Sequence, residues 1–170
     1  MRLSILSVLT TLLVAPSYTS GQTKSPPRLY VSEGACPFEG CIYRDWIANR
    51  TVELMNRPGG RPVAKIHQGE SVSAITGRIY THPLAFRVEQ SPSKKPLVKA
   101  GSTIYLLHPI GEGFWLVWHQ SKVFPMDPQY AGLGPKYEWW ARVKTPSGQT
   151  GWVLMKVNDL PFDRVDRLAS

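Results

Sequence analysis

Glycine and proline interrupt this chain so often that long helices have little room to form. The sequence of 170 residues contains 14 glycines and 15 prolines. Proline removes a backbone donor, and glycine destabilises a helix interior. After the N-terminal segment, no window of about 11 residues has apolar residues at helical spacing. Many short segments separated by turn residues are typical of a β-sandwich or β-barrel. The sequence therefore predicts an all-β fold.

The expected strands alternate apolar and polar residues or form short apolar runs, as a strand with one or two buried faces does. Two polar, proline-containing segments are predicted to be loops, residues 89–96 and 121–137. Residues 79–88 are expected to continue the strand before them or to pair with it. The other expected strands are residues 51–55, 63–67, 71–77, 104–108, 114–118 and 139–144, with a return strand around Trp152.

Residues 139–154 are the most specific of these signals and predict a β-hairpin. Residues 145–148, Thr-Pro-Ser-Gly, supply the turn, because proline presets φ and glycine accepts a positive φ. Gly151 in the return strand indicates a bulge or a close backbone approach. The first strand is expected to place Trp139, Ala141 and Val143 on one face and Trp140, Arg142 and Lys144 on the other.

The N-terminus has the layout of a signal peptide. Arg2 is followed by an apolar stretch from Ile5 to Ala15 and then by small residues up to Gly21. The stretch is shorter than the roughly 20 apolar residues that span a bilayer, so no stable transmembrane anchor is expected, although a retained N-terminal anchor is the alternative. We predict a signal peptide at 1–21 and a periplasmic or extracellular protein. We further predict a linker at 22–29, a folded domain at 30–160 with an insertion near 78–138, and a C-terminal tail at 161–170.

Two cysteines, Cys36 and Cys41, are the only ones in the chain. In an exported protein, an even number of closely spaced cysteines predicts a disulfide. Free or redox-active thiols and a metal site are the alternatives. A redox centre usually has the Cys-x-x-Cys spacing, and further ligands for a metal are not obvious.

The chain is basic, with a formal net charge of +8. A positive surface favours anionic partners such as wall polymers, lipid headgroups or nucleic acid. The charge is spread thinly, and its densest part, Lys94, Lys95 and Lys99, lies in a polar loop that we expect to be solvated. A nucleic-acid partner is therefore not predicted.

Residues 51–60 read TVELMNRPGG, and residues 63–72 read VAKIHQGESV. Residues 140–143, WARV, are followed by residues 148–153, GQTGWV. These three segments resemble the bacterial SH3-like (SH3b) domain family. The first looks like the first strand and loop of that family, the second like its next strand and turn, and the third like its closing hairpin. About 65 residues separate the second segment from the hairpin, where the family usually has few.

The resemblance implies a small SH3-like β-barrel with long loop insertions, or alternatively two degenerate SH3-like barrels in tandem. It also implies attachment to peptidoglycan or to an envelope protein, usually without catalysis. Candidate ligand-binding residues are the aromatic side chains of Trp140 and Trp152 in the hairpin and of Trp115 and Trp118 in the strand at 114–118. Packing in the core is the alternative role for all four.

Catalytic and metal-binding patterns are not found in the sequence. The four histidines have no metal-ligand spacing, and we see neither a nucleophile elbow nor a phosphate-binding loop. We therefore expect no cofactor and no enzyme. The sequence predicts an exported, non-enzymatic binding module that contacts a cell-wall polymer or an envelope protein. The alternative is a structural or assembly scaffold of the envelope, with the loops at 89–100 and 121–137 docking a partner.

Overall fold

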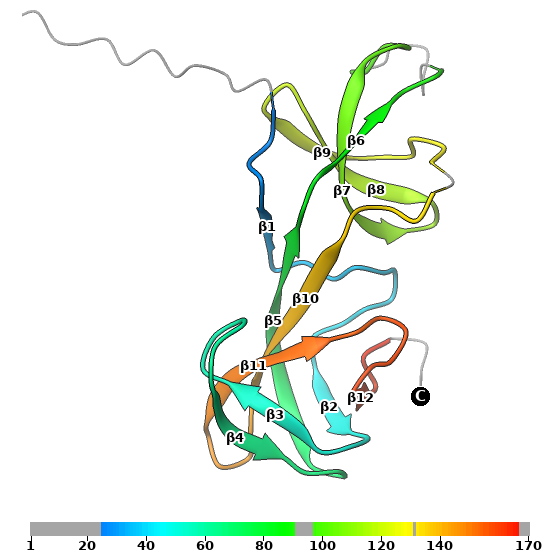
Figure 1. Cartoon of the computed structure of the whole chain (residues 1–170). Helices are drawn as coiled ribbons and strands as arrows, with labels where there is room; N and C mark the ends of the chain where they lie inside the picture. Colours follow the sequence, from blue (N-terminus) through cyan, green and yellow to red (C-terminus); the bar gives the residue numbers. More distant parts are fainter. Residues whose placement is uncertain (1–24, 91–96, 131, 167–170) are drawn as a thin grey trace, which may run out of the picture.

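The described part of the chain is all-β, as predicted. The computed structural model describes residues 25–90, 97–130 and 132–166, and these contain strands and no helix. The predicted signal peptide and the lysines at 94 and 95 lie outside the described residues. Two antiparallel sheets form the molecule, a large one and a small one, and Figure 1 shows them one above the other.

The large sheet has eight strands. Their order is β12-β2-β5-β10-β11-β3-β4, and β1 pairs with the end of β5 beyond β2. The sheet curls around one core as a half-barrel, which fits a small β-barrel fold (Figure 1). The bounds are β1 (Tyr30–Glu33), β2 (Asp45–Ala48), β3 (Val52–Met55), β4 (Pro62–Ile66), β5 (Ser71–Thr81), β10 (Tyr137–Lys144), β11 (Thr150–Met155) and β12 (Phe162–Asp163).

The small sheet lies between β5 and β10 in the sequence, inside the predicted insertion near 78–138. It is a meander of β6 (Leu84–Arg87), β7 (Thr103–Gly111), β8 (Phe114–His119) and β9 (Lys122–Met126). The insertion is thus an ordered sheet and not loops alone. Because β5 pairs directly with β10, the insertion leaves the half-barrel continuous.

Two segments differ from the expected elements. Residues 79–88 continue β5 as far as Thr81, which confirms one of the two alternatives, and then form β6. The other alternative, pairing with β5, is wrong, because β6 pairs with β7. Residues 121–137, predicted to be a loop, begin with β9. Pro125 made that segment look like a loop. Proline is tolerated in β9 because β9 is the last strand of its sheet, so one edge of the strand needs no ladder hydrogen bonds.

The closing hairpin has the predicted form. Trp139, Ala141 and Val143 are all 1% exposed or less and belong to the large core. Gly148 has a φ of 86° in the turn. A Cβ on Gly151 would lie 2.7 Å from the Met55 carbonyl oxygen, so this glycine permits a close approach of β11 to β3. The bulge in this region lies on β10, between Arg142 and Val143.

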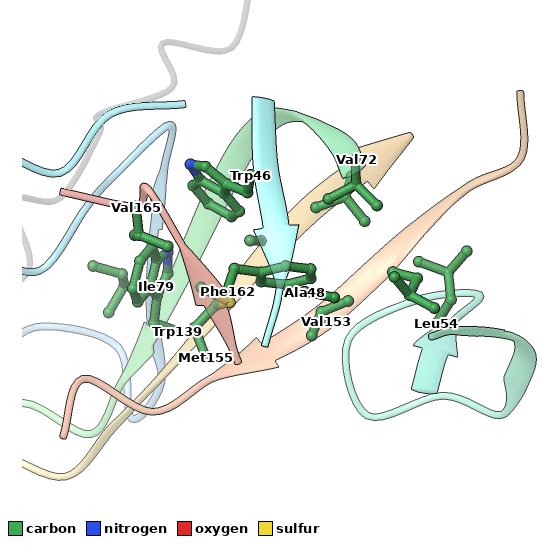
Figure 2. Packing of buried hydrophobic residues seen from close by; sticks show 13 residues of the cluster. Trp46, Ala48, Leu54, Val72, Ile79, Trp139, Val153, Met155, Phe162 and Val165 are labelled. Atoms are coloured by element: carbon green, nitrogen blue, oxygen red, sulfur yellow. The ribbon is translucent and has the colours of Figure 1, made fainter. Parts of the chain in front are cut away.

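The large core fills the concave side of the half-barrel. Figure 2 shows buried side chains of this core packed together, with Trp46, Phe162 and Trp139 among the largest. The small sheet has a separate core around Ile104, Leu106 and Val117. Each sheet therefore buries its own apolar face, and each supplies part of the hydrophobic stabilisation.

The chain ends of the folded part are fixed on the large sheet. Cys36 and Cys41 form a disulfide with a Cα–Cα distance of 6.0 Å, as predicted.

Phe162 and Val165, in the segment predicted to be a C-terminal tail, are 2% and 1% exposed and lie in the large core. The core thus extends beyond residue 160.

A buried polar contact joins the two sheets. His108 of β7 is 1% exposed, and its Nε2 atom lies 3.0 Å from Ser32 Oγ of β1. The Nδ1 atom lies 3.0 Å from the Pro109 carbonyl oxygen, which can only accept, so Nδ1 carries the proton and Nε2 accepts from the serine. Burial lowers the pKa of His108, which keeps the ring neutral.

Candidate functional site

The convex face of the large sheet carries the aromatic and charged residues that do not enter the core. On β10, Glu138, Trp140 and Arg142 point to this face, because their neighbours in sequence point into the core. In the register with β5, Trp140 lies opposite Arg78, and with β11 it lies opposite Leu154. The register thus places residues from three strands in one row.

Trp140 has a fixed orientation on this face. Its Nε1 atom donates a hydrogen bond of 3.1 Å to Glu138 Oε2. The side chain is covered on most sides, since Trp140 is only 6% exposed. Its edge forms part of the wall of a groove and is not an open platform.

That groove, which we call the Trp140 groove, has a volume of about 700 Å³ and lies between the convex face and the β3–β4 turn. The sheet contributes Tyr80, Glu138 and Trp140, and the turn contributes Arg57 and Pro58. Further side chains at the rim are Leu29, His82, Lys136 and Tyr137. Leu29 is 44% exposed, so an apolar surface is open to solvent beside the polar groups.

The β3–β4 turn is held by its own hydrogen bonds. The backbone N–H of Asn56 donates to the Arg61 carbonyl, and that of Gly60 donates to the Arg57 carbonyl. The Asn56 side-chain oxygen accepts from the Arg61 N–H at 3.1 Å. Gly59 has a φ of 64°, a conformation that glycine adopts without steric cost. The turn therefore presents Arg57 and Pro58 from a fixed backbone.

Positive charge dominates the rim of the Trp140 groove. Arg57 and Lys136 are exposed, and neither forms an ion pair with a described residue. The one carboxylate in the lining, Glu138, accepts the hydrogen bond from Trp140. A ligand with negative charge therefore meets cations that have no partner of opposite sign in this part of the chain.

Trp152 lies on the same convex face, next to Trp140 but outside the groove lining. The guanidinium carbon of Arg78 lies 4.8 Å from the centroid of its ring, a cation–π arrangement. Arg78 Nε also donates to Glu33 Oε2 at 2.7 Å. The hydrogen bonds that Arg78 donates to Glu33 and to Tyr80 raise its pKa above the ordinary value. Arg78 is thus occupied by its neighbours, and Trp152 is covered by it.

The other two candidate tryptophans lie in the small sheet. Trp115 packs against the small core, and its ring centroid is 5.8 Å from that of Tyr130. Trp118 is 5% exposed and packs edge-to-face against Tyr105 at 5.6 Å. The structure therefore brings two of the four predicted tryptophans to one face and places one of them, Trp140, in a groove.

Several residues of the Trp140 groove could not be recognised as site residues in the sequence. In the sequence, Arg57 and Pro58 were visible only as part of a loop, and Tyr80 only as part of residues 79–88, which were expected to continue the preceding strand or to pair with it. The pairing of β5 with β10 places Tyr80 beside Glu138, and one sequence does not reveal that pairing. Lys136 and Tyr137 lie where the chain returns from the small sheet, inside the predicted loop at 121–137, although Tyr137 is the first residue of β10.

The described residues offer little else that could perform chemistry. No group of three or more histidines, cysteines or acidic residues in them could hold a metal ion. The one buried Ser–His contact, Ser32 with His108, is 7% and 1% exposed, and a substrate has no access to it in this structure. No helix in the described ranges is long and apolar enough to cross a membrane.

Comparisons with protein-family models, curated proteins and solved structures gave no match for this chain. The resemblance to the SH3b family therefore stays a prediction from the motifs. The fold class, all-β with a small half-barrel, is independent of that resemblance. The disulfide indicates an oxidising compartment, as exported proteins encounter.

Proposed function

We propose that this protein is an exported, non-enzymatic binding module that contacts a cell-wall polymer or an envelope protein through the Trp140 groove. The observation that carries the proposal is the groove itself, which combines aromatic rings, an exposed leucine and unpaired cations. Concave sites with apolar walls and a few polar groups are the usual place for ligands. The disulfide and the signal-peptide layout support export to the periplasm or the extracellular space.

Co-sedimentation with purified peptidoglycan tests this proposal. The wild-type protein is expected to sediment with the polymer, and Tyr80→Ala is expected to lower the bound fraction, because Tyr80 is half-buried in the groove floor. Phe114→Ala is the matched control, since Phe114 is 45% exposed on the small sheet and lies outside the groove. Equal binding of wild type and Tyr80→Ala would count against the groove as the binding site.

A scaffold function is the second candidate, and exposed leucines favour it. Leu97 is 71% exposed and Leu133 is fully exposed, and each lies in one of the two segments predicted to dock a partner. Exposed apolar side chains of this size are common at protein interfaces. This function would be favoured if one envelope protein co-purified in stoichiometric amount and the wild type did not bind the wall. The double variant Leu97→Ser with Leu133→Ser is then expected to lose the co-purifying protein.

A further inference from the structure

We propose that the occupant of the Trp140 groove is an anionic glycan whose sugar rings carry carboxylates. This inference rests on the proposed function, because it takes the Trp140 groove as the binding site and specifies the ligand class.

The charge of the rim favours an anion. Arg57 and Lys136 both line the groove, Arg57 from the β3–β4 turn and Lys136 from the segment that leads into β10. Neither has an anionic partner among the described residues. The guanidinium can bind a carboxylate through two hydrogen bonds, and the ammonium contributes a point charge. A carboxylate-bearing chain that passes between them would neutralise both.

The hydrogen bonding of the floor argues against an added peptide strand. Tyr80 is paired with Val31 on one side and with Glu138 on the other. Trp140 is paired with Arg78 and with Leu154. Because both floor strands already have neighbours on both sides, the floor offers no open strand edge, which β-strand addition requires. Recognition in this groove must come from side chains.

The side chains that remain suit a sugar ring with one charged substituent. Tyr80 and the exposed Leu29 give an apolar surface, and pyranose rings have an apolar face of C–H groups. The hydroxyl of Tyr80 and the ring of His82 add polar groups at the edge. Apolar contact in the floor and cations at the rim thus correspond to the two parts of an acidic sugar.

Binding of a defined oligouronate, measured by titration calorimetry at low salt, tests the proposal. The wild type is expected to bind it, and to bind a neutral oligosaccharide of equal length and a poly-glutamate peptide of equal charge much more weakly. Arg57→Ala with Lys136→Ala is expected to weaken oligouronate binding about tenfold, a change of about 1.4 kcal/mol. The control is Lys99→Ala with Lys122→Ala, which removes two exposed cations outside the groove. It is expected to bind as the wild type does.

The outcomes separate this inference from the proposed function. Equal binding of the oligouronate and the neutral sugar would overturn it, as would equal or tighter binding of poly-glutamate, which would indicate an acidic protein partner. A similar loss in the control pair would show that net charge alone governs binding, and this too would overturn it. Sedimentation with peptidoglycan but no binding of the oligouronate would refute the acidic glycan and leave the proposed function standing.

Discussion

Trp139 Nε1 donates a hydrogen bond of 3.2 Å to the Tyr43 hydroxyl, and this hydroxyl donates in turn to the Ala35 carbonyl oxygen at 2.6 Å. The contact links the closing hairpin to the segment that contains the disulfide. Burial raises the pKa of Tyr43 to about 12. The neutral hydroxyl is thus the form that the folded state favours.

A pH dependence of stability follows from this shift. The contribution of Tyr43 is complete below pH 10, the pKa of the tyrosine when it is exposed in the unfolded chain. It is lost as the pH rises from 10 toward 12, because the unfolded chain releases the proton more easily than the folded one. We expect the free energy of unfolding of wild type, measured with urea, to fall more steeply in this range than that of Tyr43→Phe. Parallel curves for the two proteins would contradict the assignment.

Gly77 is the residue that leaves room for this contact. A Cβ at this position would meet the Tyr43 hydroxyl and would lie 2.7 Å from the Ala35 carbonyl oxygen and 2.8 Å from Trp139 Nε1. We expect Gly77→Ala to destabilise the fold by about 1–3 kcal/mol, as overpacking of a core does. Urea unfolding measures this loss. Gly113→Ala is not a suitable control, because Gly113 has a φ of 80°, at which alanine is strained whatever its packing. The control is Ser71→Ala, at an exposed position on the same strand. If Ser71→Ala and Gly77→Ala lowered the free energy of unfolding by similar amounts, the steric argument would be refuted.

The disulfide is expected to contribute moderately to stability. Its five-residue sequence separation encloses a short loop, and the chain-entropy model gives about 2 kcal/mol for a loop of this size. We expect Cys36→Ser with Cys41→Ser to lower the free energy of unfolding by this amount, and a reductant to lower that of wild type equally. If the reductant also lowered the free energy of unfolding of the double variant, the reductant would be acting on something other than this disulfide.

The hairpin shows how far the sequence determines this fold. Alternation along residues 139–144 correctly identified which side chains enter the core, because the period of a strand fixes its two faces. The same alternation could not identify the Trp140 groove. That site requires Arg57 and Tyr80 to line the same groove, which depends on the register of β5 with β10 and on the path of the β3–β4 turn. The polar C-terminal segment was misleading for a related reason. Phe162 and Val165 are too few to form a pattern, but Phe162 pairs with β2 and both side chains fill the core.

The C-terminal segment should therefore be essential to the large sheet. Phe162 is 2% exposed, and its ring centroid lies 5.6 Å from that of Trp46 (Figure 2). Removing a buried phenylalanine side chain typically costs about 3–5 kcal/mol, and we expect Phe162→Ala to lower the free energy of unfolding by this amount. Phe114→Ala, an exposed phenylalanine of the small sheet, is expected to change it by less than about 0.5 kcal/mol. If Phe162→Ala were as stable as Phe114→Ala, β12 would contribute nothing to the core, and the folded domain would end before it.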